Sequence, residues 1–97
     1  MRLVYLRSTE RDFAWLRAYY SRVFPEGDKR AREQFRAIAR LLGDNPLIGR
    51  PSVAPDVREL VIPRTPFSLI YRVSEDRIEV LRIWDNRADR SGLGDEI

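Results

Sequence analysis

Arginines set among apolar residues are the side chains of this chain best suited to chemistry. Between residues 57 and 90, three short β-type runs each carry one arginine: Arg58, Arg72 and Arg82. A guanidinium inside a strand that also builds a core is costly unless it is paired or faces solvent or a partner. Its planar fork suits carboxylates and phosphates. We therefore interpret the three as a basic sheet surface that binds a target, with Arg64 and Arg87 at its edge.

The alternative for each arginine is structural: it extends to the rim of the sheet or pairs with Glu59 or Glu79. Strand alternation puts Arg82 on the same face as Val80 and Trp84. Because these neighbours should belong to the core, Arg82 is the strongest single candidate for target contact. We interpret Trp84 as a core or sheet-edge anchor rather than as a stacking platform.

The residue types that are missing exclude several classes of site. The chain has no cysteine and no histidine, which rules out disulfides, thiol nucleophiles, Cys/His metal sites and a histidine base. A catalyst would have to use carboxylates, tyrosine, serine, arginine or Lys29. We expect no metal site and no cofactor. The net charge is only +3, so direct nucleic-acid binding stays open.

The length and composition predict one small globular domain over residues 1–97. Hydrophobic residues make up 43% and charged residues 34% of the chain, and no apolar run approaches the roughly 20 residues of a membrane span. Met1 leads directly into a candidate strand, so no secretory signal is visible. We expect a cytoplasmic protein with no membrane partner.

The first half of the chain predicts a strand and a helix. Residues 2–6 are rich in β-branched and aromatic types. Thr9 and Asp12 have the spacing of a capping box, and the helix should run to about Phe24. Its apolar face is Phe13, Leu16, Tyr19, Tyr20, Val23 and Phe24.

A second helix should begin at Asp28, as N-cap, and end at Gly43, as a left-handed terminator. Its apolar face is Ala31, Phe35, Ile38, Leu41 and Leu42, and the opposite face carries Arg32, Arg36 and Arg40. The short connection predicts an antiparallel helical hairpin. The arginine stripe is typical of a solvated helix face.

The second half predicts three strands, at 57–62, 66–73 and 77–84, after a Pro/Gly loop at 44–56. The last eight or so residues should fray. The order is β-α-α-β-β-β, which indicates an α+β fold: a helical hairpin packed on a small, mainly antiparallel sheet.

Four segments in order, NPLIGRP, REL, RTPFSLIYRV and DRIEVLRIWDNR, resemble the RelE/ParE superfamily of toxins from type II toxin–antitoxin modules. The resemblance covers most of the chain, and PFSLIYRV and VLRIW look closer to ParE-like members. It implies the β-α-α-β-β-β fold and a bacterial, plasmid-stabilising toxin that a cognate antitoxin holds inactive. ParE-like members arrest growth through DNA gyrase, whereas RelE-like members cut messenger RNA on the ribosome.

The chain departs from the RelE-like ribonucleases at the positions that carry their chemistry. Those enzymes place basic groups along the strand that here has Glu59 and Val61, and an arginine where Ser68 stands. They also place a tyrosine or histidine near the C-terminus, where the final ten residues here have neither. RNA cleavage needs a proton acceptor, a proton donor and cations.

We therefore predict no catalytic residue and favour inhibition of DNA gyrase by binding. The alternatives are a ribosome-dependent mRNA endoribonuclease and a non-toxic interaction module. Asp85–Asn86 stands where many relatives have histidine–glycine. Asp85 should pair with Arg87 or cap the strand end.

The aromatic arc of the first helix is about 180° wide, more than one sheet contact requires. Such an excess predicts a partner groove. The resemblance implies that the antitoxin lays a C-terminal segment over the helical hairpin, and Trp15 and Tyr19 are our candidates for its contacts. The alternative is that both pack against the loop at 44–56.

Overall fold

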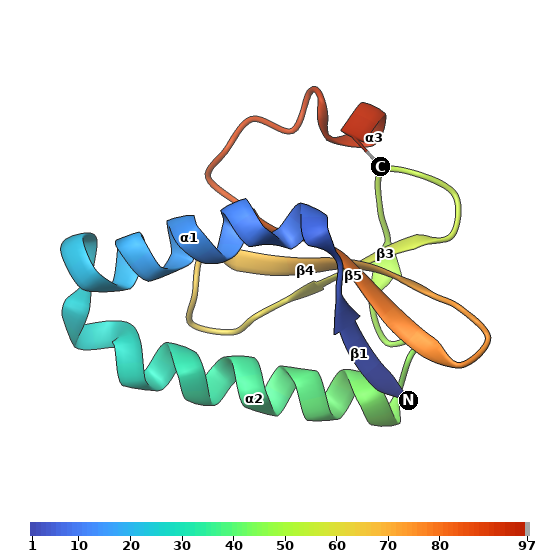
Figure 1. The fold of residues 1–97 in the computed structure, drawn as a ribbon, viewed down its shortest axis with the longest axis horizontal. Coiled ribbons are helices and arrows are strands. Elements are labelled where there is room, and N and C mark those ends of the chain that lie inside the picture. Colours follow the sequence, from blue (N-terminus) through green and yellow to red (C-terminus); the bar gives the residue numbers. More distant parts are fainter. Residues whose placement is uncertain (97) are drawn as a thin grey trace.

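The computed structural model describes residues 1–96 and places two helices on one face of a five-stranded mixed sheet (Figure 1). The sheet order is β1-β5-β4-β3-β2, with β1 parallel to β5 and every other pair antiparallel. The strands are β1 (Arg2–Tyr5), β2 (Arg50–Pro51), β3 (Val57–Val61), β4 (Phe67–Val73) and β5 (Arg77–Asp85). The helices are α1 (Glu10–Ala18), α2 (Asp28–Asp44) and α3 (Leu93–Glu96). The predicted α+β fold is confirmed, with β2 and α3 as additions.

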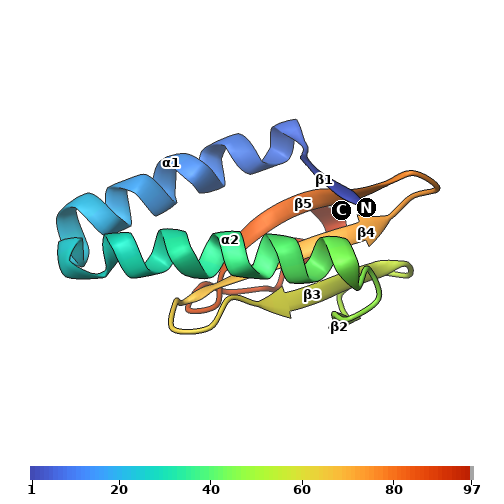
Figure 2. The ribbon, with the colours of Figure 1, turned by 90° about the horizontal axis from the view of Figure 1, so that it is seen from below.

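The helical hairpin forms as predicted, but its ends differ. A π-helical turn, Tyr19–Val23, follows α1 directly, so helical backbone continues to within one residue of Phe24. Gly27, rather than Asp28, is the N-cap of α2. Gly43 does not end α2; the helix runs through it to Asp44. Both views show the two helices diverging from the hairpin turn (Figure 2).

The prediction of a capping box at Thr9 is wrong. The Thr9 hydroxyl donates to the Leu6 carbonyl at 2.7 Å and does not cap α1. Asp12, the presumed partner in the box, is buried and bonded to β5 instead. A tertiary contact 70 residues away has replaced the local one.

The main core lies between the helices and the sheet. Its fully buried members include Leu42 from α2, Phe67 and Tyr71 from β4, and Ile78 and Val80 from β5. This apolar burial is the dominant favourable term in holding the hairpin on the sheet.

A smaller cluster covers the opposite face of the sheet, hereafter the outer face. Val57, Ile70 and Leu81 are buried there. The chain after β5 returns over this face, and Leu93 is only 1% exposed. The segment for which the sequence predicts fraying includes the short helix α3, and the last residue of that prediction, Ile97, lies outside the described residues.

A β-bulge in β5 sets the direction of Arg82. Ile70 pairs with Arg82 but the next residue of β4, Tyr71, pairs with Val80. Leu81 is therefore an extra residue, and strict alternation breaks at this point. Val80 faces the helices, whereas Arg82 lies with Trp84, so the predicted shared face of Arg82 and Val80 is wrong.

Candidate functional site

The N-terminal part of α1 covers an open edge of β5. Strand β1 pairs with β5 only as far as Val80, and an unpaired strand edge invites association with other chains. Ser8 Oγ donates to the Leu81 carbonyl at 2.6 Å, and the Ile83 N–H donates to Asp12 Oδ2 at 2.9 Å. Ser8, from the 3₁₀ turn before α1, and Asp12, from the first turn of α1, thus bind backbone groups of β5 that β1 leaves unpaired.

Asp12 also holds Arg82 in a buried ion pair. Arg82 donates through Nε and one terminal nitrogen to the two carboxylate oxygens, at 2.8 Å each. The side chains are only 10% and 8% exposed. The Arg82 guanidinium lies 5.1 Å from the ring centroid of Trp84. The structural alternative for Arg82, pairing with a carboxylate, is the one observed, but its partner is Asp12.

A second cluster is centred on Asp85. Its carboxylate accepts bonds from the Arg87 guanidinium, at 2.9 and 2.7 Å, and from Trp15 Nε1, at 3.1 Å. The guanidinium lowers the pKa of Asp85 to about 2, and the predicted Asp85–Arg87 pair is confirmed. Arg87 also lies 4.7 Å from the ring centroid of Tyr19. The structure thus brings Trp15, Tyr19 and Arg87 together.

The other candidate arginines lie apart from this cluster and from each other. Arg58 donates to the Leu47 and Gly49 carbonyls, at 3.2 and 2.8 Å, and so fastens the Pro/Gly loop. Arg72 binds Glu79 at 2.6 Å on the outer face. Arg64 is exposed at the β3–β4 turn, with φ at 62°. These arginines do not form one basic surface, because their faces differ and most are held by intramolecular partners.

The outer face of β3 and β4 has a polar cluster under the C-terminal segment. Glu59, 3% exposed, accepts two bonds from Arg90, at 2.7 and 2.8 Å, and one from Arg50 at 3.3 Å. The bonds from Arg90 are the largest cause that lowers the pKa of Glu59 to about 2. Next to it, Asn86 Nδ2 donates to Ser68 Oγ at 2.9 Å. Glu59 is therefore an ion-paired anion at neutral pH.

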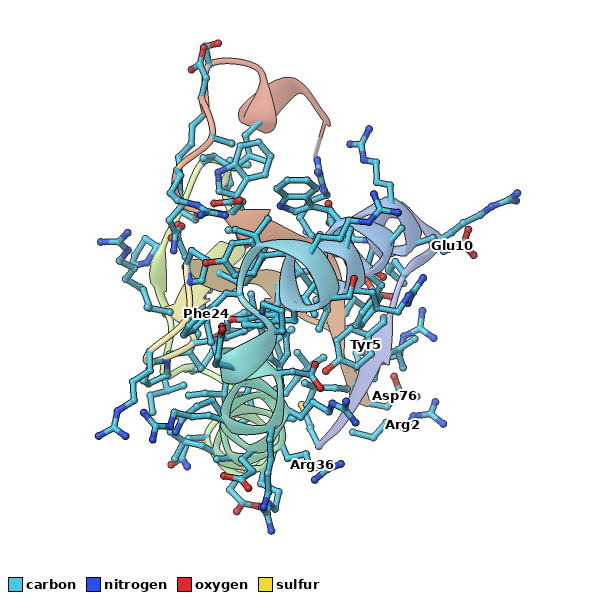
Figure 3. All side chains as sticks on the ribbon, turned by 90° about the vertical axis from the view of Figure 1, so that its left-hand side faces the viewer. Arg2, Tyr5, Glu10, Phe24, Arg36 and Asp76 are labelled. Carbon is cyan, nitrogen blue, oxygen red and sulfur yellow. The ribbon has the colours of Figure 1, made fainter. Side chains whose placement is uncertain are left out.

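An apolar groove of about 330 Å³ separates α1 from α2. Tyr5 lies at its β1 end and Arg36 on its α2 side (Figure 3). Its apolar lining is Tyr5, Phe13, Leu16, Tyr20, Ala31, Phe35 and Ala39, and its charged lining is Asp28, Arg32 and Arg36. Trp15 and Tyr19 do not line it.

The width of the aromatic arc predicted a partner groove beside α1. The structure has a groove between α1 and α2, and Trp15 and Tyr19, the predicted contacts of the antitoxin, lie outside it. The spacing of Phe13, Leu16 and Tyr20 placed them on the apolar face. What the sequence missed is that the helices diverge, which leaves that face partly open between them.

Comparison with known proteins decides the family. Residues 3–90 match the family described as the ParE toxin of the type II toxin–antitoxin system parDE. The chain belongs to the ParE toxin family. A solved structure of the chromosomal ParDE TA system from P. aeruginosa is similar, with a TM-score of 0.68 and 34% identity, covering 86% of this chain and 92% of that one. A search of proteins with curated functions returned no match.

As a ParE-type toxin, the protein is a component of a type II toxin–antitoxin module, and this family membership implies an antitoxin partner. Within residues 1–96, no helix is both long and apolar enough to cross a bilayer. The same part of the chain has no group of three or more carboxylates placed to hold a metal ion.

Proposed function

We propose that this ParE toxin inhibits DNA gyrase by binding to it and stabilising the DNA break that gyrase itself makes. Its antitoxin would neutralise it by filling the groove between α1 and α2. The observation that carries the first part is the state of Glu59 and Ser68. These residues stand where RelE-like ribonucleases place basic groups.

The chemistry of Glu59 argues against cutting RNA. A general base works best when its pKa lies near the operating pH, whereas the pKa of Glu59 is about 2. Its oxygens are already bonded to Arg90, Arg50 and Ser52. An anion at this position would also repel the phosphate that a ribonuclease must hold. Binding to an enzyme that itself breaks DNA requires neither a general base nor a phosphate-holding group in this protein.

The groove supports the second part of the proposal. An amphipathic helix fits a channel with an apolar floor, in the manner of other helix-in-groove complexes. Arg32 and Arg36 at the rim would favour a helix with acidic residues beside its apolar face. We therefore assign antitoxin contact to groove residues such as Tyr5 and Phe35 rather than to Trp15 and Tyr19.

The test is a gyrase supercoiling reaction with purified toxin freed of antitoxin. We expect linear plasmid once gyrase is denatured, and we expect it to disappear when antitoxin is added first. If the same preparation arrests growth but leaves gyrase unaffected, messenger cleavage on purified ribosomes is the next assay. Cleavage there would replace the gyrase proposal with ribonuclease activity.

A further inference from the structure

We propose that the exposed side of α2 binds the phosphate backbone of duplex DNA through a basic ridge formed by Lys29, Arg32, Arg36 and Arg40. Phosphates carry no sequence information, so the contact would not depend on the base sequence. It would hold the toxin on DNA beside the enzyme that it inhibits. This inference goes beyond the proposed function, because it can be tested on DNA without gyrase.

The four cations of the basic ridge follow one side of α2. At 3.6 residues per turn they fall within an arc of about 80°, which faces away from the buried residues Ala31, Ile38 and Leu42. From Lys29 to Arg40 the ridge is about 16 Å long, because each residue of an α-helix rises by about 1.5 Å. The helix is straight and lies at the surface of the protein (Figures 1 and 2), and all four residues of the ridge are exposed.

The ridge has few carboxylate partners inside the protein, which distinguishes it from an ordinary solvated helix face. Such faces carry both signs of charge, joined in pairs three or four residues apart. Arg32 makes a pair of this kind with Asp28, and its side chain remains 67% exposed. Within residues 1–96, the side chains of Lys29, Arg36 and Arg40 take part in no hydrogen bond or ion pair. Their charges are therefore available to a partner.

One acidic residue, Glu33, stands beside the ridge. It lines a hollow of about 250 Å³ together with Lys29, Arg32 and Arg36. The hollow thus has three cations and one anion around it. Because the net charge of the whole chain is only +3, the grouping of cations on this side of α2, rather than the total charge, favours an anionic partner.

The composition of the ridge favours phosphates over the surface of a protein. The core of a protein interface is apolar and rich in aromatic residues, whereas the arc of the ridge holds only cations between Lys29 and Arg40. One strand of duplex DNA has a phosphate for about every 3.4 Å of its axis, so the ridge is as long as about five phosphates. A straight row of guanidinium and ammonium groups therefore fits such a regular row of negative charges.

The same composition favours a duplex over a single strand. Proteins that bind single strands combine cations with aromatic rings on which the bases stack. The ridge has no aromatic ring between Lys29 and Arg40, so it offers unstacked bases nothing to stack on. In a duplex the bases are already stacked, and the backbone alone faces the ridge.

The test measures how purified toxin, freed of antitoxin, binds a labelled duplex oligonucleotide at several salt concentrations. Each neutralised phosphate contributes about −0.9 to the slope of log affinity against log salt, so four contacts predict a slope between about −3 and −4. Affinity should then fall by about a hundredfold between about 50 and 200 mM salt. Lys29→Ala and Arg40→Ala should each reduce the steepness of this slope by about 1. Neither residue lines the groove between α1 and α2, so the proposed antitoxin site is left intact.

Two further variants serve as controls. Arg7→Ala removes an exposed arginine before α1, at the end of the hairpin where the two helices are far apart (Figure 1), and should leave the slope unchanged. Glu33→Gln removes the acid of the hollow and should tighten DNA binding by about two- to fivefold, a gain that partial unfolding would not produce. All four variants should melt like the original protein, because the substituted residues are exposed.

The outcomes separate this inference from the gyrase proposal. If the toxin does not bind the duplex at low salt, or if folded Lys29→Ala and Arg40→Ala variants keep the original slope, the ridge is not a DNA contact, and the gyrase proposal is unaffected. Tighter binding to a single strand of the same length would overturn the assignment of a duplex. Weaker gyrase affinity in both variants without DNA, together with unchanged duplex binding, would make the ridge a protein contact instead. A toxin that binds the duplex as expected but leaves gyrase unaffected would support the ridge and overturn the gyrase proposal.

Discussion

Replacing Asp12 with alanine would test how α1 is held on the sheet. The substitution removes two bonds to Arg82 and one from the Ile83 N–H. It takes the Asp12 carboxylate away from a guanidinium that is only 10% exposed. Breaking a buried ion pair by removing one partner costs about 3–5 kcal/mol. Since domains of this size are stable by about 5–15 kcal/mol, we expect a loss near the lower value, about 3 kcal/mol, to be a large share of the total.

The assay is urea unfolding of the purified toxin, which should show a lower midpoint with an unchanged slope. Asp12→Asn is the matched control, because its amide keeps one oxygen for the Ile83 N–H while it removes the charge and one acceptor of the Arg82 guanidinium; it should lose less. Arg82→Ala alone should also destabilise. The double variant should lose clearly less than the sum of the two, since the two side chains bind each other directly and each single variant already removes that contact.

A loss below about 1 kcal/mol for Asp12→Ala, with an additive double variant, would refute this reasoning, because exposed pairs behave that way. The result also bears on how toxicity data are interpreted. Arg82→Ala can abolish growth arrest simply by unfolding the protein. Loss of toxicity in that variant therefore identifies a target contact only if the variant's stability is unchanged.

Three further predictions concern the groove, the outer face and the loop. Phe35→Ala should weaken antitoxin binding by about 2 kcal/mol or more, measured by titration calorimetry, whereas the control Phe24→Ala should bind as the original protein does. If Phe35→Ala also binds with the original affinity, the antitoxin does not occupy the groove. The pKa of Glu59 is lowered from 4.5 to about 2 in the folded protein, so its stabilisation is complete above about pH 4.5 and lost as the pH falls towards 2. Glu59→Gln should flatten the dependence of the urea midpoint on pH in that range. If the midpoint of the variant changes with pH as steeply as that of the original protein, the ion pair between Arg90 and Glu59 contributes little to stability. Gly49→Ala would place a methyl group 2.5 Å from the Tyr71 hydroxyl, so the melting temperature should fall, by the equivalent of about 1–3 kcal/mol; an unchanged value would show that the loop moves freely.

The fold was largely predictable from the sequence because its apolar spacing is regular. The period of Ala31, Phe35, Ile38 and Leu42 fixes the buried face of α2, and Leu42 is fully buried. The three C-terminal strands were found within one residue of their observed ends because turns rich in proline, serine or acidic residues bound them. The local sequence was sufficient to predict the position of residues that contact only the core directly beneath their own helix or strand.

Predictions failed where a residue's partner is distant in the chain. Thr9 and Asp12 have capping-box spacing in the sequence, yet Asp12 bonds to Arg82 and Ile83. Nothing local distinguishes an aspartate that caps a helix from one that holds a strand 70 residues later. The bulge at Leu81 is another such case, since one unpaired residue reverses the face of Arg82 without any glycine to mark it.

The aromatic arc of α1 contributes to two different surfaces of the protein. Its width was a sound indication that α1 makes more contacts than one sheet face requires. The structure divides those contacts into two flanks: Phe13 and Leu16 face the groove, while Trp15 extends towards Asp85 at the edge of β5. Hydrophobicity alone does not separate these flanks, because it groups Trp15 with Phe13 and does not show that the polar residue Asp12 is turned inwards. Two surfaces on one short helix allow two partners to be recognised by different residues.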